Sequence, residues 1–265
     1  MEVIKPRALS LKRIFILAYN APTMNAFKFV LLVGGLLLLP TMGVNGQQQP
    51  GVPRAPDATD NPLVVSLPPQ GKLVHDKPVG KHWVNMLKSL DGWNADPRYW
   101  SLRDGVLHGD YDGGKFHNFS WTKKTYQDFE LNVLIRMTGK NANSGVCIRL
   151  HPTSADDAPG YQVDMGEGYW GSLWEERRAG MVQLFPQNLV PQLVHADDWN
   201  HYYVIAKGHH IQAWLNGVKT IDVIDDKGLL TGPIGFQLCH GVGKMTDVSF
   251  KDVMFRPIKT ANHSN

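Results

Sequence analysis

The feature of this sequence that most constrains its fold is the recurrence of short alternating or apolar runs with turn residues between them. In the body of the chain, after residue 80, no stretch of a dozen residues keeps a helical apolar period without Gly or Pro. Asn216-Gly217, between two such runs, is the strongest short signal for a β-hairpin, because a type I′ turn needs positive φ at both central positions. We therefore expect an all-β sandwich or barrel rather than a sheet with crossover helices. The predicted strands are Trp100–Gly109, Phe129–Met137, Gly145–Leu150, Tyr161–Met165, Tyr202–Lys207, Ile211–Leu215, Val218–Ile224, Ile234–Leu238 and Val248–Phe255.

Alternation along these runs predicts which side chains leave the core of a two-layer sandwich. Successive residues of a strand point to opposite faces, so the polar residues between apolar ones share the other face of their sheet. That polar face is either simply solvated or binds a ligand. It is expected to carry Cys147, Arg149, Gln162, Asp164 and Gln237.

The charge of the chain is unevenly placed, and this limits the classes of partner. The formal charge is +3, but residues 1–46 hold five bases and one acid, so the remaining 219 residues are close to neutral at −1. Phosphate binding needs clustered Lys and Arg, so a nucleic-acid partner is not expected.

Residues 1–46 are predicted to be a signal peptide. Phe29–Leu39 is an apolar run too short to span a bilayer and of the right length for the hydrophobic region of a signal sequence, with Lys28 before it. Met24 is the expected start. An uncleaved membrane anchor is the alternative. We expect a periplasmic or secreted protein without stable membrane insertion after cleavage.

The rest of the chain divides by composition. Residues 47–80 are rich in Pro, Gln and Asp and are expected to be an extended linker. Residues 81–258 are expected to form a single folded domain, and 259–265 a short polar tail.

The segment Gly160–Gly180 combines aromatic and charged residues in the way a sugar site does. Aromatic rings stack on the C–H face of a pyranose, and charged side chains bind its hydroxyls. For Trp170 and Trp174, the sequence is equally compatible with packing in the core and with contact to a ligand.

Eight segments, in order over about 170 residues, carry a resemblance to a known family. The sequence resembles the 3-keto-disaccharide hydrolase domain, a secreted bacterial family. The resemblance implies a concanavalin/laminin-G-like jelly-roll β-sandwich. The segments are Asp128–Leu131, Asn143–Arg149, Gly160–Asp164, Gly171–Glu176, Asp198–Asn200, Leu215–Gly217, Gly232–Gln237 and Phe250–Val253.

The sequence departs from the family pattern at one position. The family usually has a His two residues after the Gln of the penultimate strand, whereas this chain has Cys239 there and His240 one residue later. A shift of one residue turns a side chain to the opposite face of a strand. His240 stays a candidate only if a bulge redirects it.

The resemblance implies an enzyme that acts on a glucoside or disaccharide already oxidised at C3. The ketone acidifies the C2 proton, so a base can remove it and the enolate can expel the C1 substituent, with water adding afterwards. Direct water attack at C1 by paired carboxylates is the alternative.

The expected roles follow from this chemistry. Asp164 or Glu176 is the candidate base, and the family pattern favours Glu176 over its neighbour Glu175. Arg149 is the candidate clamp for the oxyanion, with a surface ion pair to Asp164 as its alternative role. The candidate substrate-binding residues are Asn143, Gln162, Trp170, Trp174, Gln237 and His240.

Three further questions stay open from the sequence. A divalent metal is compatible with the number of His and carboxylates, but no HxH or HExxH spacing occurs, so no metal ligand is assigned. Cys147 and Cys239 are either free or paired in one disulfide. A non-catalytic, lectin-like module that binds sugars on the same sheet face is the alternative function.

Overall fold

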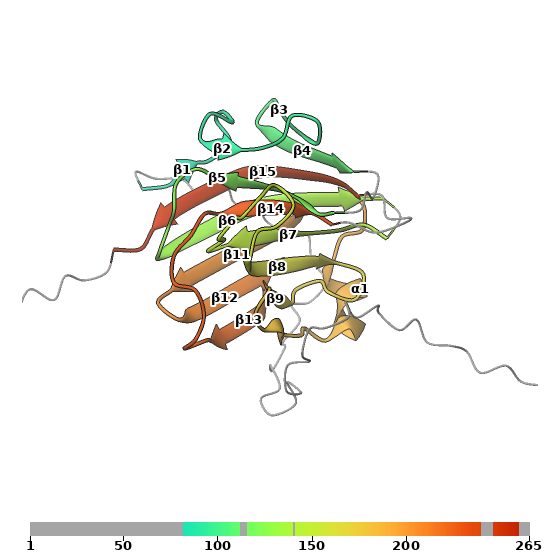
Figure 1. Cartoon of the computed structure of the whole chain (residues 1–265). Coiled ribbons are helices and arrows are strands. Elements are labelled where there is room, and N and C mark those ends of the chain that lie inside the picture. The colour runs from blue at the N-terminus through green and yellow to red at the C-terminus, as the bar shows by residue number, and fades with distance from the viewer. Residues whose placement is uncertain (1–81, 112–115, 140, 240–245, 260–265) are drawn as a thin grey trace, which may run out of the picture. The chain divides into compact units, whose positions relative to one another are not determined.

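The folded part of the chain is a β-sandwich of two antiparallel sheets (Figure 1). The computed structural model describes residues 82–111, 116–139, 141–239 and 246–259. The predicted leader and linker lie outside these residues, as do His240 and residues 260–265 of the predicted tail. The expectation of an all-β jelly-roll sandwich is confirmed.

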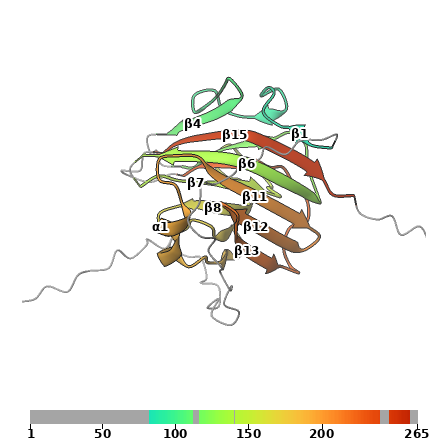
Figure 2. The same cartoon turned by 180° about the vertical axis from the view of Figure 1, so that it is seen from behind.

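The larger sheet has eight strands and forms one layer, seen from behind in Figure 2. Its order is β13-β12-β11-β6-β15-β4-β3, with β1 paired to β15. The strands are β1 (Val84–Asn85), β3 (Trp100–Arg103), β4 (Val106–Tyr111), β6 (Phe129–Thr138), β11 (Asn200–Lys207), β12 (His210–Leu215), β13 (Val218–Ile224) and β15 (Thr246–Pro257).

The smaller sheet has seven strands and forms the second layer, in the order β10-β9-β8-β7-β14-β5-β2. Its strands are β2 (Trp93–Asn94), β5 (Asn118–Thr122), β7 (Asn143–Ile148), β8 (Gly160–Gly166), β9 (Leu173–Glu176), β10 (Gly180–Gln183) and β14 (Gly235–Leu238). The described residues also hold a 3-10 turn, η2 (Gln187–Leu189), and one turn of α-helix, α1 (Val190–Leu193). No helix in the described part of the chain is long and apolar enough to cross a membrane.

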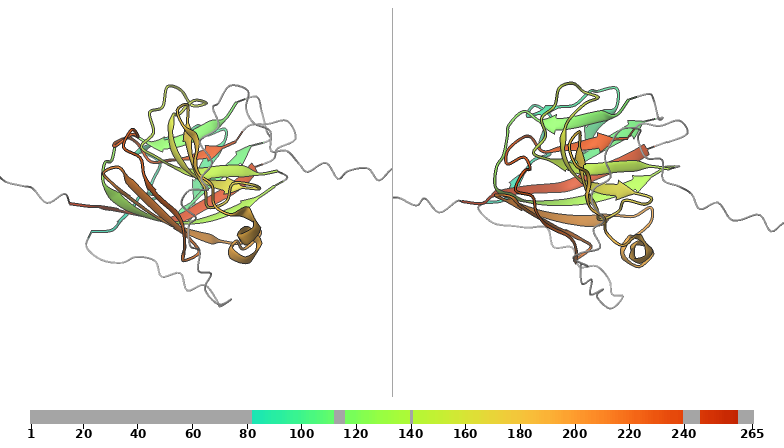
Figure 3. Two further views of the ribbon diagram at one scale, coloured as in Figure 1. Left: turned by 90° about the horizontal axis from the view of Figure 1, so that it is seen from below. Right: turned by 60° about the horizontal axis from the view of Figure 1, so that its bottom comes forward.

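The core lies between the two sheets, which Figure 3 shows as separate layers. Phe236 of β14 stacks on Phe250 of β15 with ring centroids 3.9 Å apart, and Trp93 also stacks on Phe236, at 5.7 Å. Because the inward residues of both sheets are apolar, burial of these side chains supplies most of the stabilisation of the sandwich.

Two turns show how far local signals determine the strands. Asn216 and Gly217 have φ of 50° and 82°, as the predicted hairpin requires. The predicted single strand Trp100–Gly109 is wrong: Asp104 and Gly105 have φ of 50° and 73° and make a tight turn between β3 and β4.

Candidate functional site

A hydrogen-bonded polar cluster lies on the outer face of the seven-stranded sheet, the face turned away from the core. The register places Gln237 beside Gly145 and Gly145 beside Asp164, so these positions of β14, β7 and β8 share one row across the sheet. The next row places Gly235, Cys147, Gln162 and Trp174 side by side. Both rows alternate with core residues such as Val146 and Val163.

Gln162 connects the cluster. Its Nε2 donates to Gln237 Oε1 at 3.0 Å, to Asp164 Oδ1 at 3.2 Å and to the carbonyl of Ser144 at 3.3 Å. Gln162, Asp164 and Gln237 are all buried, so these bonds replace contacts with water.

Asp164 is held in one orientation. Its Oδ1 accepts the backbone N–H of Met165 at 2.8 Å and the side-chain amide of Asn143 at 3.4 Å, in addition to Gln162. A carboxylate fixed by several N–H donors is oriented before a ligand arrives, which is what a general base requires.

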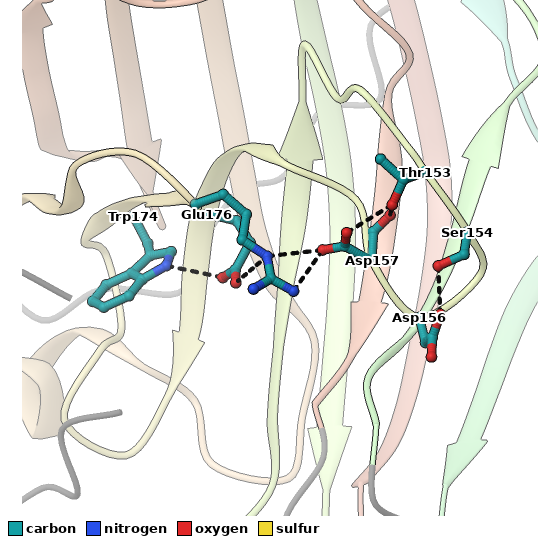
Figure 4. Close-up of polar contacts among 7 residues, drawn as sticks. Thr153, Ser154, Asp156, Asp157, Trp174 and Glu176 are labelled. Carbon is teal, nitrogen blue, oxygen red and sulfur yellow. Dashed lines mark hydrogen bonds and ion pairs between the residues drawn. The ribbon is translucent and has the colours of Figure 1, made fainter. Parts of the chain in front are cut away.

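Glu176 belongs to a second, separate group (Figure 4). Its Oε2 accepts the indole N–H of Trp174 at 3.2 Å, and its Oε1 lies 3.9 Å from Arg177 Nε. Arg177 in turn pairs with Asp157 at 2.8 Å, and Asp157 accepts the hydroxyl of Thr153 at 2.7 Å.

The two candidate carboxylates are therefore well apart along the sheet. Glu176 pairs with Gly160, four residues before Asp164 on β8. At about 3.3 Å per residue this is roughly 13 Å between their backbones, with Gln162 between them. Glu175 points the other way: it is buried between the sheets and pairs with Arg178.

Arg149 does not join either group, contrary to its expected position on the polar face. β7 ends at Ile148, and Arg149 takes a φ of +53°, which breaks the alternation of the strand. Its guanidinium is buried and donates to the carbonyls of Leu229 at 2.9 Å and Gln127 at 3.2 Å. Its nearest acid is Asp128 at 3.8 Å rather than Asp164, and burial lowers its pKa. Arg149 therefore links two loops through their carbonyl groups. Its contacts support neither the oxyanion clamp nor the ion pair with Asp164.

The two candidate tryptophans also differ in position. Trp174 is half-buried on the outer face beside Gln162. Trp170 follows β8 and packs against the core cluster, where its ring stacks on Tyr202 at 6.5 Å. Trp174 can therefore contact a ligand at the polar cluster, whereas Trp170 is placed for packing.

Cys147 and Cys239 are buried, and the two are not joined in a disulfide. Burial, together with the charges of Asp164 and Glu176, raises the pKa of Cys147 well above its ordinary value, so this thiol stays protonated. Within the described residues no group of three or more His, Cys, Asp or Glu side chains is arranged to hold a metal ion.

Two features of this face were not predicted. The first is Trp121, which lies on β5 in the same row as Gly235, Cys147 and Gln162. The second is the segment 151–159 between β7 and β8, which we call the strap. The strap packs over Phe119 and Cys147 through Ala158, and its Ala155 carbonyl accepts the backbone N–H of Phe119 at 2.9 Å. The one sequence signal that could have predicted Trp121 on this face is the alternation of residues along Asn118–Thr122.

The sequence that builds this sandwich matches the model of a known protein family. The family model of the 3-keto-alpha-glucoside-1,2-lyase-like domain matches residues 82–256. The chain belongs to this family. No curated protein sequence matches the chain.

Two of the solved structures similar to this family member agree on the fold. Two proposed glycosyl hydrolases of Parabacteroides distasonis match with 22% and 17% identity and TM-scores of 0.50 and 0.51. Each match covers 67% of this chain, and it covers 100% and 94% of the respective structure. A carbohydrate-binding module of Bacillus subtilis matches at 15% identity with a TM-score of 0.46, covering 62% of this chain and 95% of the module.

Proposed function

We propose that this chain cleaves 3-keto-glucosides, including 3-keto-disaccharides, and that Asp164 is the general base. The observation that carries the proposal is the buried Asp164 carboxylate, held on Oδ1 by Met165 N, Gln162 and Asn143, on the outer sheet face of a 3-keto-glucoside lyase-like domain. Because the carboxylate is fixed, it loses little freedom when it takes a proton from a bound sugar.

The proposed reaction is a β-elimination. Asp164 takes the proton from C2, which the C3 ketone acidifies, and the electron pair of the C2–H bond passes into the C3 carbonyl to form an enolate. As the enolate collapses, the C3 carbonyl is restored, the C1=C2 double bond forms and the C1–O bond breaks. The leaving oxygen receives the proton that Asp164 holds. The products are an unsaturated 3-keto sugar and the free alcohol, and water adding across the double bond gives the free 3-keto sugar.

The remaining residues are assigned by their distance from Asp164. Gln162, Asn143 and Gln237 position the carboxylate and bind hydroxyls near it. Trp174 and Glu176, on the far side of Gln162, are assigned to substrate binding, with the indole as a stacking surface.

The contacts of the two carboxylates favour elimination over direct hydrolysis. Direct hydrolysis by a glycosidase needs two carboxyl groups at the same bond. Glu176 is instead bonded to the Trp174 indole and lies beside Arg177, in a group separate from that of Asp164. A single base is sufficient for the elimination, so the route does not need the second carboxylate at the same bond.

The test is incubation of the full chain with a 3-keto-disaccharide, following the absorbance of the enone and the release of reducing sugar. We expect Asp164→Asn to lower turnover by roughly 10²–10⁴-fold while the melting temperature stays near that of the wild type. Asp156→Asn, an exposed position on the strap, is the matched control and should keep full activity. Deuterium from solvent at C2 of the product supports elimination.

Other outcomes decide against the proposal. Full activity of Asp164→Asn would remove this residue from the base role. Binding of sugars without turnover of any 3-keto substrate, with and without a chelator, would favour the lectin-like module. We further propose export, supported by the predicted leader at 1–46; cell fractionation tests it, and a cytoplasmic full-length chain would contradict it.

A further inference from the structure

A pocket separate from the Asp164 cluster lies at the other side of the same sheet, where β2 meets β5. Its volume is about 310 Å³, which is at the lower end of the range for small-molecule sites. Its lining includes Asn94, Asp96, Phe119, Trp121, Lys123 and Ala155.

The register shows that the pocket opens on the outer face. Asn94 pairs directly with Trp121, so their side chains leave the sheet on the same side. Phe119 is two residues before Trp121 and shares this face, and the strap closes one wall through Ala155. Three inter-strand steps, roughly 14 Å, separate Trp121 from Gln162.

The chemistry of the lining suits a neutral sugar ring. Trp121 is half-buried, which leaves part of its indole for stacking, and no hydrogen bond of its indole N–H is found among the described residues. The Asn94 amide opposite it likewise has no side-chain partner there. Asp96 and Lys123 add an acceptor and a donor at the rim: Asp96 is bound to the exposed Arg98, and the Lys123 ammonium uses one bond to the carbonyl of Asp91 at 2.9 Å.

We propose that this pocket is an accessory site that binds a pyranose ring of an unoxidised sugar, with Trp121 as the stacking surface and Asn94 as the hydrogen-bonding partner. The pocket mixes an aromatic face with groups of both charges, whereas an anionic ligand would need an excess of cations and a purely apolar ligand would leave the Asn94 amide unpaired. The strap separates the pocket from Gln162, so a sugar held there does not reach Asp164.

The experiment measures binding rather than turnover, so it does not depend on the proposed reaction. The full chain is titrated with methyl α-glucoside and with maltose by calorimetry and by ¹H–¹⁵N NMR of the tryptophan indoles, with glycerol as the non-sugar control. We expect the Trp121 indole signal, assigned by its loss in Trp121→Phe, to shift on titration. Trp121→Ala should weaken binding about tenfold or more, which is the scale of one stacking contact.

Matched variants separate the two regions of the sheet. Trp214→Ala removes a half-buried tryptophan of the other sheet and, as the matched control, is expected to leave the binding of unoxidised sugars unchanged. Trp174→Ala reports on any sugar bound beside Gln162. If the Trp121 signal does not move, or if Trp174→Ala and not Trp121→Ala abolishes binding, the accessory site is wrong. Those results would leave the proposed cleavage at Asp164 untouched, since turnover of 3-keto substrates is measured separately.

Discussion

The side chain of Gln162 lies over the backbone of Gly145, with no room between them. A methyl group at position 145 would come within 2.2 Å of Gln162 Cγ and 2.6 Å of its Nε2. The glycine is therefore what allows Gln162 to lie flat on the sheet and reach both Gln237 and Asp164.

We expect Gly145→Ala to push Gln162 away from Asp164. Turnover of a 3-keto-disaccharide should fall by at least tenfold, and overpacking should cost roughly 1–3 kcal/mol of the free energy of unfolding. Steady-state kinetics and urea denaturation measure the two effects. Gly92→Ala, where no atom lies within 4 Å of the added methyl, is the control and should change neither. Wild-type turnover in Gly145→Ala would show that the position of Gln162 does not matter.

Arg149→Met is expected to affect stability rather than turnover. The variant removes two hydrogen bonds to carbonyls and leaves the buried Asp128 without its nearby cation. We expect a loss of about 3 kcal/mol in the free energy of unfolding, with kcat of the folded protein within about twofold of the wild type. Arg177→Met, at an exposed ion pair, is the comparison and should cost less than about 1 kcal/mol. A hundredfold fall in kcat at unchanged stability would instead place Arg149 at the reacting sugar.

The ion pair between Asp157 and Arg177 is expected to hold the strap over Cys147. In a Cys239→Ser background, Asp157→Asn should raise the rate at which a thiol reagent labels Cys147, because this thiol is only 1% exposed beneath the strap. The global stability should change by less than about 1 kcal/mol, since the pair is largely exposed. Asp156→Asn serves as the control. Equal labelling rates in both variants would mean that the strap is held by its packing alone.

Glu175 should make the stability of the fold depend on pH. Burial raises its pKa, in opposition to the ion pair with Arg178, which lowers it. A carboxyl group with a raised pKa in the folded state stabilises the fold below its unfolded pKa of about 4.3 and loses that contribution as the pH rises through the folded value. The melting temperature of Glu175→Gln minus that of the wild type should therefore increase from pH 4 to pH 7. A constant difference would contradict this.

Alternation along strands was sufficient to place part of the site. Because the strand period is two, it put Gln162, Asp164 and Gln237 on one face, and the structure has them there in hydrogen-bonding contact. The same rule failed for Arg149, because one residue with a left-handed φ ends the regularity on which the rule depends.

Other parts of the face depend on contacts between distant segments. The two residues of β2 are too few to show a period, so nothing local indicated that Asn94 pairs with Trp121. The strap has no regular structure along most of its length, and its position comes from the backbone bond to Phe119 and the ion pair with Arg177. Sequence patterns report local geometry, whereas these contacts are set by the assembled sandwich.

The strap also limits the length of chain that the sheet can accept. It lies over Phe119 and Cys147, in the middle of the rows that run from Trp121 to Trp174. A polysaccharide laid across the strands would meet this segment before it could occupy both halves of the face. Under the proposed function, the strap therefore favours short glycosides and chain ends over the interior of a polymer.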